Sequence, residues 1–395
     1  MPKRVAIIGA GPAGLMAAEV LSQYDYEIDV FEQKPSAARK FLMAGKTGLN
    51  ISHAEPVEAF IQRYDQTQWL APWVRQWDAT WIQDWMQGLG IESYVGSSGR
   101  IFPVEMKAAP LLRAWLKRLM ADGVKFHYRH RCVDLSENQL TIENQTQRFC
   151  VTYDAIILAC GAVSWSQLGS DGAWQPWLSK NEIEPFQASN AGVLKTWSPF
   201  MQQCFGQPLK RVNAWVRPEQ QTHGDIIITH YGFESGVIYK LGRELRAQIA
   251  QQQTLQLHLD LLPDLSLEQL EKKLQGNKKQ SLTNLWRKAG LDTVKINLLR
   301  EIVAKNLWSD AKQMAQQIKQ LCIPLEGFRP IEEAISCAGG VRRAVLSPQL
   351  QLQSNPSVFC CGEMLDWDAP TGGYLLTACF ATGRAAAEGV HAFIE

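Results

Sequence analysis

The fold of this chain is decided close to its N-terminus, by the segment Val5-Ala6-Ile7-Ile8-Gly9-Ala10-Gly11-Pro12-Ala13-Gly14. Its first four residues are apolar and suit a strand that is buried on both faces. The glycines that follow fit the pattern G-x-G-x-x-G, and a helix is predicted from Ala13 to Gln23. A second strand is predicted from Ile28 to Glu32. Between a strand and a helix, this pattern predicts a dinucleotide-binding site.

Each glycine of the pattern has its own physical role. Gly9 allows a tight turn, Gly11 lets the backbone approach a pyrophosphate, and Gly14 lets the helix pack closely on the strand. The helix starts near Pro12 and Ala13, where free N–H groups and the positive end of the helix dipole favour an anion. We therefore expect this turn to hold a pyrophosphate.

An acidic residue stands where the second predicted strand ends. Glu32 can accept hydrogen bonds from the ribose hydroxyls of an adenosine, and Gln33 and Lys34 follow it directly. The alternative is an ordinary glycine-rich turn with an acid downstream by chance. The order of strand, glycines, helix and acid favours the nucleotide.

Three later segments favour FAD over NAD. An apolar strand from Ala155 ends in Ala159-Cys160-Gly161, and a strand near the C-terminus ends in Cys360-Cys361-Gly362-Glu363. Thr371-Gly372-Gly373-Tyr374 then opens the last predicted helix. In flavoproteins with two dinucleotide-binding motifs, a Gly-Glu strand end meets the ribityl chain and phosphates. The start of such a helix can stabilise the negative charge of a reduced flavin.

With these motifs in place, the chain resembles the BaiN-type, YhiN-like family of bacterial NAD(P)/FAD-dependent oxidoreductases, in a branch of uncharacterised flavoproteins. The resemblance spans nearly the whole chain. It rests on segments 40–50, 99–103, 161–172, 229–232, 338–341 and 362–374. It implies an α/β fold in which a Rossmann-like FAD-binding domain of the two-dinucleotide-binding flavoprotein type is interrupted by a mixed β and helical insert.

Two departures from the family pattern indicate a changed substrate. The family usually has Gly-Gly-Arg-Cys-Asn in the first long loop, where this chain has Lys46-Thr47-Gly48-Leu49-Asn50. Any family role of that Arg-Cys pair therefore does not carry over. After Tyr374 the family often has an asparagine, and this chain has Leu375.

The composition of the chain changes near residue 188. Alternating apolar residues then predict half-exposed strands, and helical patterns fill about 264–322. We expect residues 1–188 and 336–395 to form the FAD-binding domain. Residues 189–335 are expected to form an inserted module that covers the flavin and shapes the substrate pocket.

Tryptophans at positions 69, 73, 77, 81 and 85 predict a helix with one aromatic stripe. Pro72 suits the first turn of that helix. The stripe is either a packing face between helices or a platform that stacks on a ligand or base.

The predicted FAD contacts are drawn from all these segments. They are Gly9, Gly11, Pro12, Ala13, Gly14, Glu32, Gln33, Lys34, Arg39, Lys40, Asn50, Val133, Ala159, Cys160, Gly161, Gly362, Glu363, Asp366, Gly372, Gly373, Tyr374 and Leu375. Several keep an alternative role. Arg39 and Lys40 are either pyrophosphate ligands or solvated charges. Asn50 either faces the flavin edge or caps a loop, and Asp366 either reaches the phosphates through water or caps a turn.

Three residues are candidates for catalysis. Arg100 could fix an anionic group of the substrate, or it could form a surface ion pair. His230 and Tyr231 could donate protons, or they could be structural groups with satisfied hydrogen bonds. A flavin carries hydride at its N5 atom, so the protein needs only to position a substrate and to supply a proton.

These features lead to three hypotheses of function. The first is an FAD-dependent enzyme that reduces or oxidises an activated C=C bond of a small molecule; with no second G-x-G-x-x-G, NAD(P)H would bind only transiently. The second, which the resemblance also implies, is formation of dihydrouridine in ribosomal RNA. Its phosphate footprint would be Lys272, Lys273, Lys278, Lys279, Arg287 and Lys288, which is otherwise a solvated helix face. The third is a non-catalytic flavin-binding redox sensor.

Composition sets broad limits on these hypotheses. The chain has 395 residues, a formal net charge of +1 and nine cysteines. The small charge gives no global attraction to nucleic acid or to a membrane surface. No C-x-x-C or other metal-site spacing occurs, and no stretch resembles a secretion signal or a membrane span. We therefore expect a cytoplasmic protein with reduced thiols and no metal, in an oligomeric state that the sequence leaves open.

Overall fold

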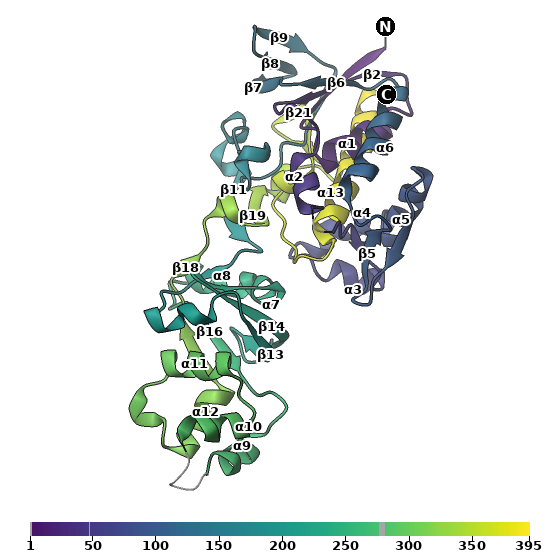
Figure 1. Cartoon of the computed structure of the whole chain (residues 1–395). Coiled ribbons are helices and arrows are strands. Elements are labelled where there is room, and N and C mark those ends of the chain that lie inside the picture. Colours follow the sequence, from purple (N-terminus) through teal and green to yellow (C-terminus); the bar gives the residue numbers. More distant parts are fainter. Residues whose placement is uncertain (1, 47, 276–280) are drawn as a thin grey trace. The chain divides into compact units, whose positions relative to one another are not determined.

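The computed structural model describes residues 2–46, 48–275 and 281–395, which fall into two compact units. The first unit comprises Met1–Gln187 and Ser336–Glu395, and the second comprises Ala188–Ile335. The first unit is therefore built from both ends of the chain, and the termini N and C are marked on it in Figure 1.

A six-stranded sheet forms the centre of the first unit, in the order β20-β21-β10-β1-β2-β6. All neighbours are parallel except β20 and β21. The strands are β1 (Lys3–Ile8), β2 (Tyr26–Glu32), β6 (Lys125–Tyr128), β10 (Ala155–Leu158), β20 (Gln351–Leu352) and β21 (Asn355–Cys360). This parallel sheet with crossing helices confirms the predicted Rossmann-like α/β class.

Two helices from opposite ends of the sequence pack together beside this sheet, as Figure 1 shows for α1 (Pro12–Leu21) and α13 (Tyr374–Ile394). Their closest approach depends on Gly383, because a Cβ atom there would lie 2.3 Å from the carbonyl oxygen of Ala13. Small residues lie along this interface, so α13 packs closely against the helix that follows the N-terminal glycines. The remaining helices of the unit are α2 (Arg39–Ala44), α3 (Val57–Ile61), α4 (Thr67–Gln76), α5 (Ala79–Gly88) and α6 (Ala108–Ala121).

The tryptophan-rich region forms two helices, so the prediction of one continuous helix is wrong. The carboxylate of Asp78 accepts a hydrogen bond from the backbone N–H of Trp81, which starts α5 as a new helix. Pro72 lies inside α4 rather than in its first turn. The tryptophan stripe packs against α13: the guanidinium of Arg384, on that helix, lies 5.3 Å and 4.7 Å from the ring centroids of Trp77 and Trp81. The packing alternative for the stripe is therefore correct.

Three smaller sheets complete the first unit. One contains β3 (Ser52–His53), β5 (Arg100–Pro103) and β4 (Ser93–Val95), and another contains β7 (Arg131–Ser136), β8 (Gln139–Glu143) and β9 (Arg148–Thr152). The third pairs β11 (Ile183–Ser189) with β19 (Ser336–Val341), where the chain leaves the unit and returns to it. Arg129, which adopts a positive φ of 59°, separates β6 from β7.

The second unit has its own antiparallel sheet, in the order β17-β16-β13-β14-β15-β12-β18. Its strands are β12 (Val193–Leu194), β13 (Pro208–Trp215), β14 (Thr222–Thr229), β15 (Gly232–Glu234), β16 (Gln256–Asp260), β17 (Leu321–Pro324) and β18 (Gly327–Phe328). Its helices are α7 (Gly236–Lys240), α8 (Gly242–Ala250), α9 (Leu267–Leu274), α10 (Leu282–Ala289), α11 (Thr293–Ile302) and α12 (Ala311–Lys319). A separate apolar core holds this unit together.

In the described part of the chain, every helix is too short or too polar to pass through a lipid bilayer.

Candidate functional site

The candidate site lies where the parallel strands of the first unit end. Strand β1 pairs with β2 on one side and with β10 on the other, so the chain order reverses at β1. In open α/β sheets, ligands bind at the carboxyl ends of the strands next to such a switch. The residues after β1, β2, β10 and β21 are those that the motifs predicted.

Two adjoining hollows open at this edge of the sheet. The inner hollow encloses about 610 Å³, part of it open to solvent, and the outer hollow about 440 Å³. Gly9, Glu32, Cys160 and Gly169 line both. The inner hollow is also lined by the predicted residues Gly11, Pro12, Ala13, Arg39, Lys40, Ala159, Gly161, Gly362 and Glu363. Together the hollows form one continuous groove, which we call the nucleotide groove.

Two glycines at this turn are required by the protein itself, and one is not. A Cβ atom at Gly9 would lie 2.4 Å from the carbonyl oxygen of Ala159, and one at Gly14 would lie 2.0 Å from that of Gly9. Gly9 also has a positive φ of 107°. By contrast, a Cβ atom at Gly11 would meet no described atom within 4 Å. The open space at Gly11 faces the groove, as expected for a backbone that a ligand approaches.

Glu32 joins the two hollows and is held by the backbone. Its carboxylate accepts hydrogen bonds from the N–H groups of Ala10, at 3.1 Å, and Lys34, at 2.7 Å. Burial raises the pKa of Glu32, and these two hydrogen bonds oppose that rise. These two hydrogen bonds fix the carboxylate of a residue that lines both hollows.

The inner hollow is closed by a long-range ion pair. The ammonium group of Lys40 lies 2.8 Å from the Glu363 carboxylate and donates a second hydrogen bond of 2.8 Å to the hydroxyl of Ser164. Two other polar atoms at this hollow, Arg39 Nε and Ser170 Oγ, are buried without a partner among the described residues. Buried donors of this kind indicate a polar ligand.

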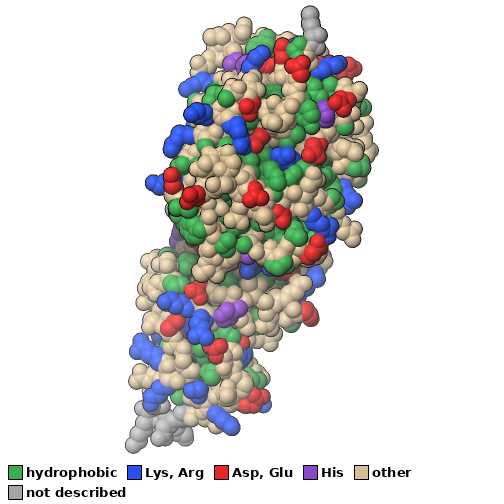
Figure 2. Space-filling model, turned by 90° about the vertical axis from the view of Figure 1, so that its right-hand side faces the viewer, with side chains coloured by type: hydrophobic (Ala, Val, Ile, Leu, Met, Phe, Trp, Pro, Cys, Tyr) green, Lys and Arg blue, Asp and Glu red, His purple; other side chains and the backbone are tan. Residues whose placement is uncertain are grey.

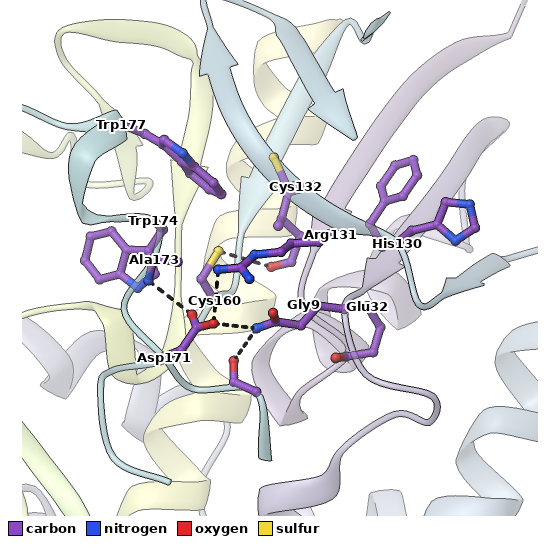
Figure 3. Close-up of a pocket in the computed structure, with 14 residues that line it drawn as sticks. Gly9, Glu32, His130, Arg131, Cys132, Cys160, Asp171, Ala173, Trp174 and Trp177 are labelled. Atoms are coloured by element: carbon purple, nitrogen blue, oxygen red, sulfur yellow. Dashed lines mark hydrogen bonds and ion pairs between the residues drawn. The ribbon is translucent and has the colours of Figure 1, made fainter. Parts of the chain in front are cut away.

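Aromatic and charged side chains line the outer hollow. Figure 3 shows Trp174 and Trp177 on one side of it, and Glu32 and His130 on the other. Arg131 points toward Asp171, and these two side chains are 3.4 Å apart. The predicted residue Gln33 donates a hydrogen bond to the carbonyl oxygen of Gly169, at 2.8 Å. A flat ring bound in the outer hollow would have aromatic walls on one side and polar groups on the other.

The start of α13 is fixed by a polar group that we call the Tyr374 cluster: Tyr374, Glu55, Arg63 and His53. The Tyr374 hydroxyl donates to the Glu55 carboxylate at 2.5 Å, and Arg63 donates two hydrogen bonds to the same carboxylate. The Tyr374 and His53 rings stack with centroids 5.8 Å apart. Burial, and then the bond to Glu55, raises the pKa of the Tyr374 phenol. This cluster anchors the Gly372-Gly373 turn.

Several predicted cofactor residues line neither hollow. Those at the start of α13 are Gly372, Gly373, Tyr374 and Leu375, and the others are Gly14, Lys34, Asn50, Val133 and Asp366. The amide of Asn50 donates to the carbonyl oxygens of Ser52 and Ile101, which matches its loop-capping alternative. The carbonyl of Val133 accepts from Trp177. Burial, and then the nearby Glu184, raises the pKa of Asp366.

The three candidate catalytic residues belong to different units. Arg100 is exposed on β5 of the first unit, and no salt bridge involves it among the described residues. His230 and Tyr231 lie between β14 and β15 of the second unit. Tyr231 donates its hydroxyl hydrogen to Glu234, and the Arg329 guanidinium lies 4.3 Å from its ring centroid. Tyr231 is therefore held in place, whereas His230 is exposed.

Sequence reasoning missed several residues of the groove. Trp174, Trp177 and Arg131 line the outer hollow, and Ser164 binds Lys40, yet none of the four was predicted as a site residue. The available signal was segment 161–172, which leads from the Gly161 strand end toward Trp174. Nothing in the spacing of Arg131 or Trp177 indicated that their side chains would reach this strand edge.

The residues of the groove fit FAD. A helix start without a side-chain cap at Gly11, the open space beside it, and the unpartnered atoms Arg39 Nε and Ser170 Oγ suit a pyrophosphate. Glu32 suits a ribose, and the outer hollow suits an adenine ring. Glu363, from the far end of the chain, adds a polar group beyond the pyrophosphate position.

Comparison with known proteins finds a full-length relative and solved structures of similar fold. The 3-dehydro-bile acid delta(4,6)-reductase of Clostridium scindens is 24% identical over 412 residues, which cover 98% of this chain and 99% of that protein. Among solved structures, a flavocytochrome c3 fumarate reductase matches with a TM-score of 0.53 and 14% identity, covering 99% of this chain and 78% of that one. A 3-ketosteroid-delta4-(5alpha)-dehydrogenase from Rhodococcus jostii RHA1 matches with a TM-score of 0.51 and 12% identity, covering 99% and 97%. At these identities the structural matches establish the fold.

The fold, the groove and the full-length match define an oxidoreductase of the FAD-dependent flavoprotein class. More narrowly, the chain belongs to the family described as HI0933-like protein Rossmann domain, whose model matches residues 3–389. This confirms the predicted family and the enzyme class.

Proposed function

We propose that this protein binds FAD along the nucleotide groove and transfers hydride to or from an activated C=C bond of a small molecule. The observation that carries the proposal is the convergence of three distant segments on one groove: Gly9–Gly14, Glu32 and Gly362–Glu363. The third segment favours FAD over NAD, because in flavoproteins with two dinucleotide-binding motifs such a Gly-Glu strand end meets the ribityl chain and phosphates.

The protein's own residues then have defined tasks. The free N–H groups at the start of α1 bind the pyrophosphate, with Arg39 and Ser170 as further donors. Glu32 accepts from the ribose. Lys40 holds Glu363 in position for the ribityl hydroxyls, and the Tyr374 cluster holds the turn at the start of α13. When bound, FAD supplies a site that accepts and returns hydride.

The relatives support the C=C bond as the target. The name of the Clostridium scindens relative describes reduction of a bile acid, and the Rhodococcus jostii RHA1 protein is a ketosteroid dehydrogenase. Both names point to C=C bonds next to a ketone, in which the carbonyl group accepts electron density as hydride adds to carbon. We therefore propose a conjugated enone as substrate and NAD(P)H as a transient reductant.

The test is the visible spectrum of the purified protein, recorded before and after anaerobic addition of NADH, NADPH and then an enone such as a 3-oxo-delta4 steroid. We expect flavin bands that bleach with one nicotinamide and return with the enone. A protein that takes up no FAD after unfolding and refolding in its presence would refute the cofactor. A reduced flavin that oxygen reoxidises but no enone does would refute the reaction.

A second candidate function is reduction of a uridine in ribosomal RNA. It is favoured by Lys272, Lys273, Arg287 and Lys288, which are exposed and make no salt bridge with any residue that the structure describes. Figure 2 shows Lys and Arg side chains close together in the lower part of that view. Lys278 and Lys279, also predicted for this footprint, lie outside the described residues.

Salt dependence tests the RNA hypothesis. If these residues contact phosphates, the affinity for a ribosomal RNA fragment should fall steeply with salt, and Lys272→Glu with Lys273→Glu should flatten the slope by about 2. An unchanged slope would exclude this surface. The third hypothesis, a flavin sensor without turnover, would be favoured only if no pair of reductant and acceptor cycles the flavin.

A further inference from the structure

The second unit carries a groove of its own, which we call the insert groove. It is lined by residues 194–199, Gln202, Phe205, His230, Tyr231 and Glu326. It encloses about 800 Å³, part of it open to solvent. Trp197, Pro199 and Phe205 give it apolar walls, and Lys195 adds a cation. All of these residues belong to the second unit, so the groove is complete within one folded unit.

The wall formed by residues 195–199 is held rigidly by two carboxylates. Thr196 donates its backbone N–H and its hydroxyl to the two oxygens of Glu326, each at 2.8 Å. Ser198 donates the same two groups to Glu301, at 2.8 Å and 2.6 Å. These paired hydrogen bonds fix the segment before any ligand arrives. Less conformational freedom is therefore lost on binding.

The aromatic walls are fixed as well. The indole N–H of Trp197 donates to the carbonyl oxygen of Thr229 at 2.9 Å, and the ring packs edge-on against Phe233 with centroids 5.1 Å apart. Tyr231 is held between Glu234 and Arg329. Flat side chains in fixed orientations favour a ligand with a planar or compact apolar ring system.

The charge in the groove selects the sign of the ligand. The Lys195 ammonium lies 6.0 Å from the Trp197 ring centroid and makes no salt bridge or side-chain hydrogen bond with any described residue. Glu326 also lines the groove, and hydrogen bonds from Thr196, followed by the charge of Lys195, lower the pKa of its carboxyl group. No salt bridge joins Glu326 to Lys195 among the described residues. All three donors of Lys195 therefore remain available to an anion beside the aromatic wall.

From this arrangement we infer that the insert groove is a binding site for a small apolar ring compound that carries a carboxylate. The ring lies against Trp197, Pro199 and Phe205, and Lys195 binds the carboxylate.

The hydroxyl groups of Thr196, Ser198 and Tyr231 already donate their hydrogens to carboxylates. Gln202 and His230 are the uncharged polar side chains of the lining that make no side-chain hydrogen bond with a described residue, which favours an apolar acid over a nucleotide. The inference goes beyond the proposed reaction, because it holds whether or not this ligand is the compound that is reduced.

Calorimetric titration of the full-length holoprotein with 2-naphthoate and its neutral analogue 2-naphthamide tests the inference. We expect 2-naphthoate to bind more tightly than 2-naphthamide. Lys195→Gln should weaken 2-naphthoate binding about tenfold, as expected for loss of a charge-assisted contact, and leave the amide unchanged. Lys195→Arg should retain binding, and Lys210→Gln is the matched control, because Lys210 is exposed on β13 outside the groove.

Three results would overturn the assignment. The first is that acid and amide bind equally, or that neither binds. The second is that Lys195→Gln and Lys210→Gln have the same effect. The third is that uridine monophosphate binds as tightly as 2-naphthoate, which would replace the apolar acid by a nucleotide. Thermal unfolding of each variant checks that the second unit remains folded.

Discussion

The two ends of the first unit's functional region are built in different ways. At the Gly9–Gly14 turn, neighbours in sequence meet: Gly14 would clash with Gly9 itself if it carried a Cβ atom. At the opposite end, Lys40 pairs with Glu363 across 323 positions, and Tyr374 with Glu55 across 319. The first end is shaped by steric limits on the backbone, and the second by polar side chains from distant segments.

This difference has a practical consequence for mutation. A substitution at Gly9 or Gly14 meets backbone atoms, which cannot move aside, so its effect on stability should be large. A substitution in a polar pair removes one of several contacts, so its effect should be graded. The following predictions test this difference, from the largest expected effect to the smallest.

Gly14→Ala should destabilise the fold strongly. The new Cβ atom would lie 2.0 Å from the backbone oxygen of Gly9 and 3.2 Å from the Ala159 side chain, so α1 must shift away from the sheet. We expect a loss of about 3 kcal/mol in the free energy of unfolding, measured by urea denaturation. Gly88→Ala is the control, since its Cβ would meet only the end of the Arg118 side chain at 3.9 Å. Equal stability of the two variants would contradict the steric account.

Gly11→Val should separate folding from cofactor binding. Gly11 has φ of −80° and open space around its Cβ position, so the apoprotein should keep its stability to within about 1 kcal/mol. The valine side chain would fill the space assigned to the pyrophosphate. FAD affinity should therefore fall at least about 100-fold, or about 2.7 kcal/mol, in titrations of the apoprotein. Normal flavin content in this variant would refute the placement of the pyrophosphate.

Lys40→Met should weaken FAD binding moderately. The variant leaves Glu363 without its ion-pair partner beside the inner hollow, and it also loses the bond to Ser164. We expect about a tenfold rise in the dissociation constant of FAD, close to 1.4 kcal/mol. Lys117→Met, an exposed substitution on α6, should leave the constant unchanged. If both variants bind FAD like the parent protein, the ion pair has no part in holding the cofactor.

Glu55→Gln should produce the smallest effect, and one that depends on pH. Burial alone would raise the pKa of Glu55, but hydrogen bonds from Arg63 and Tyr374 outweigh it and lower the pKa below the ordinary 4.5. A carboxylate with a lowered pKa in the folded state contributes stability above its unfolded pKa and loses it as pH falls through the folded value. The variant should therefore be less stable by about 1 kcal/mol at pH 7, a difference that shrinks below about pH 4.

Denaturation midpoints at pH 7 and at about pH 4 and below measure this effect. Glu58→Gln is the matched control, because Glu58 pairs with Arg75 in the same region but its side chain is 66% exposed. We expect its midpoint to stay unchanged at both values. A difference between Glu55→Gln and the parent that is constant with pH would show that the charge of Glu55 is not what stabilises the Tyr374 cluster.

The sequence predicted the parts of the site that depend on local backbone geometry. Gly9, Gly11, Glu32 and the Gly362-Glu363 strand end could be recognised because short patterns follow from the strand, turn and helix that carry them. Trp177 and Arg131 could not be recognised from the sequence. They line the same hollow only because the segment around Trp177 packs beside β7, and no local sequence pattern encodes that contact. The tryptophan stripe misled for the same reason, because Asp78 divides the helix that its spacing predicted.

The sequence by itself determined that this protein has a Rossmann-like fold with a nucleotide turn at Gly9–Gly14. The physical reason is that the tight turn at Gly9 and the close packing at Gly14 require glycine, so the spacing of these residues can be read from the sequence. Only the tertiary structure decided that Lys40 meets Glu363, that Tyr374 is anchored by Glu55, and that Lys195 stands free beside Trp197 in a groove of the second unit. Contacts of this kind are set by how whole elements pack, and residues hundreds of positions apart carry no common pattern before they meet.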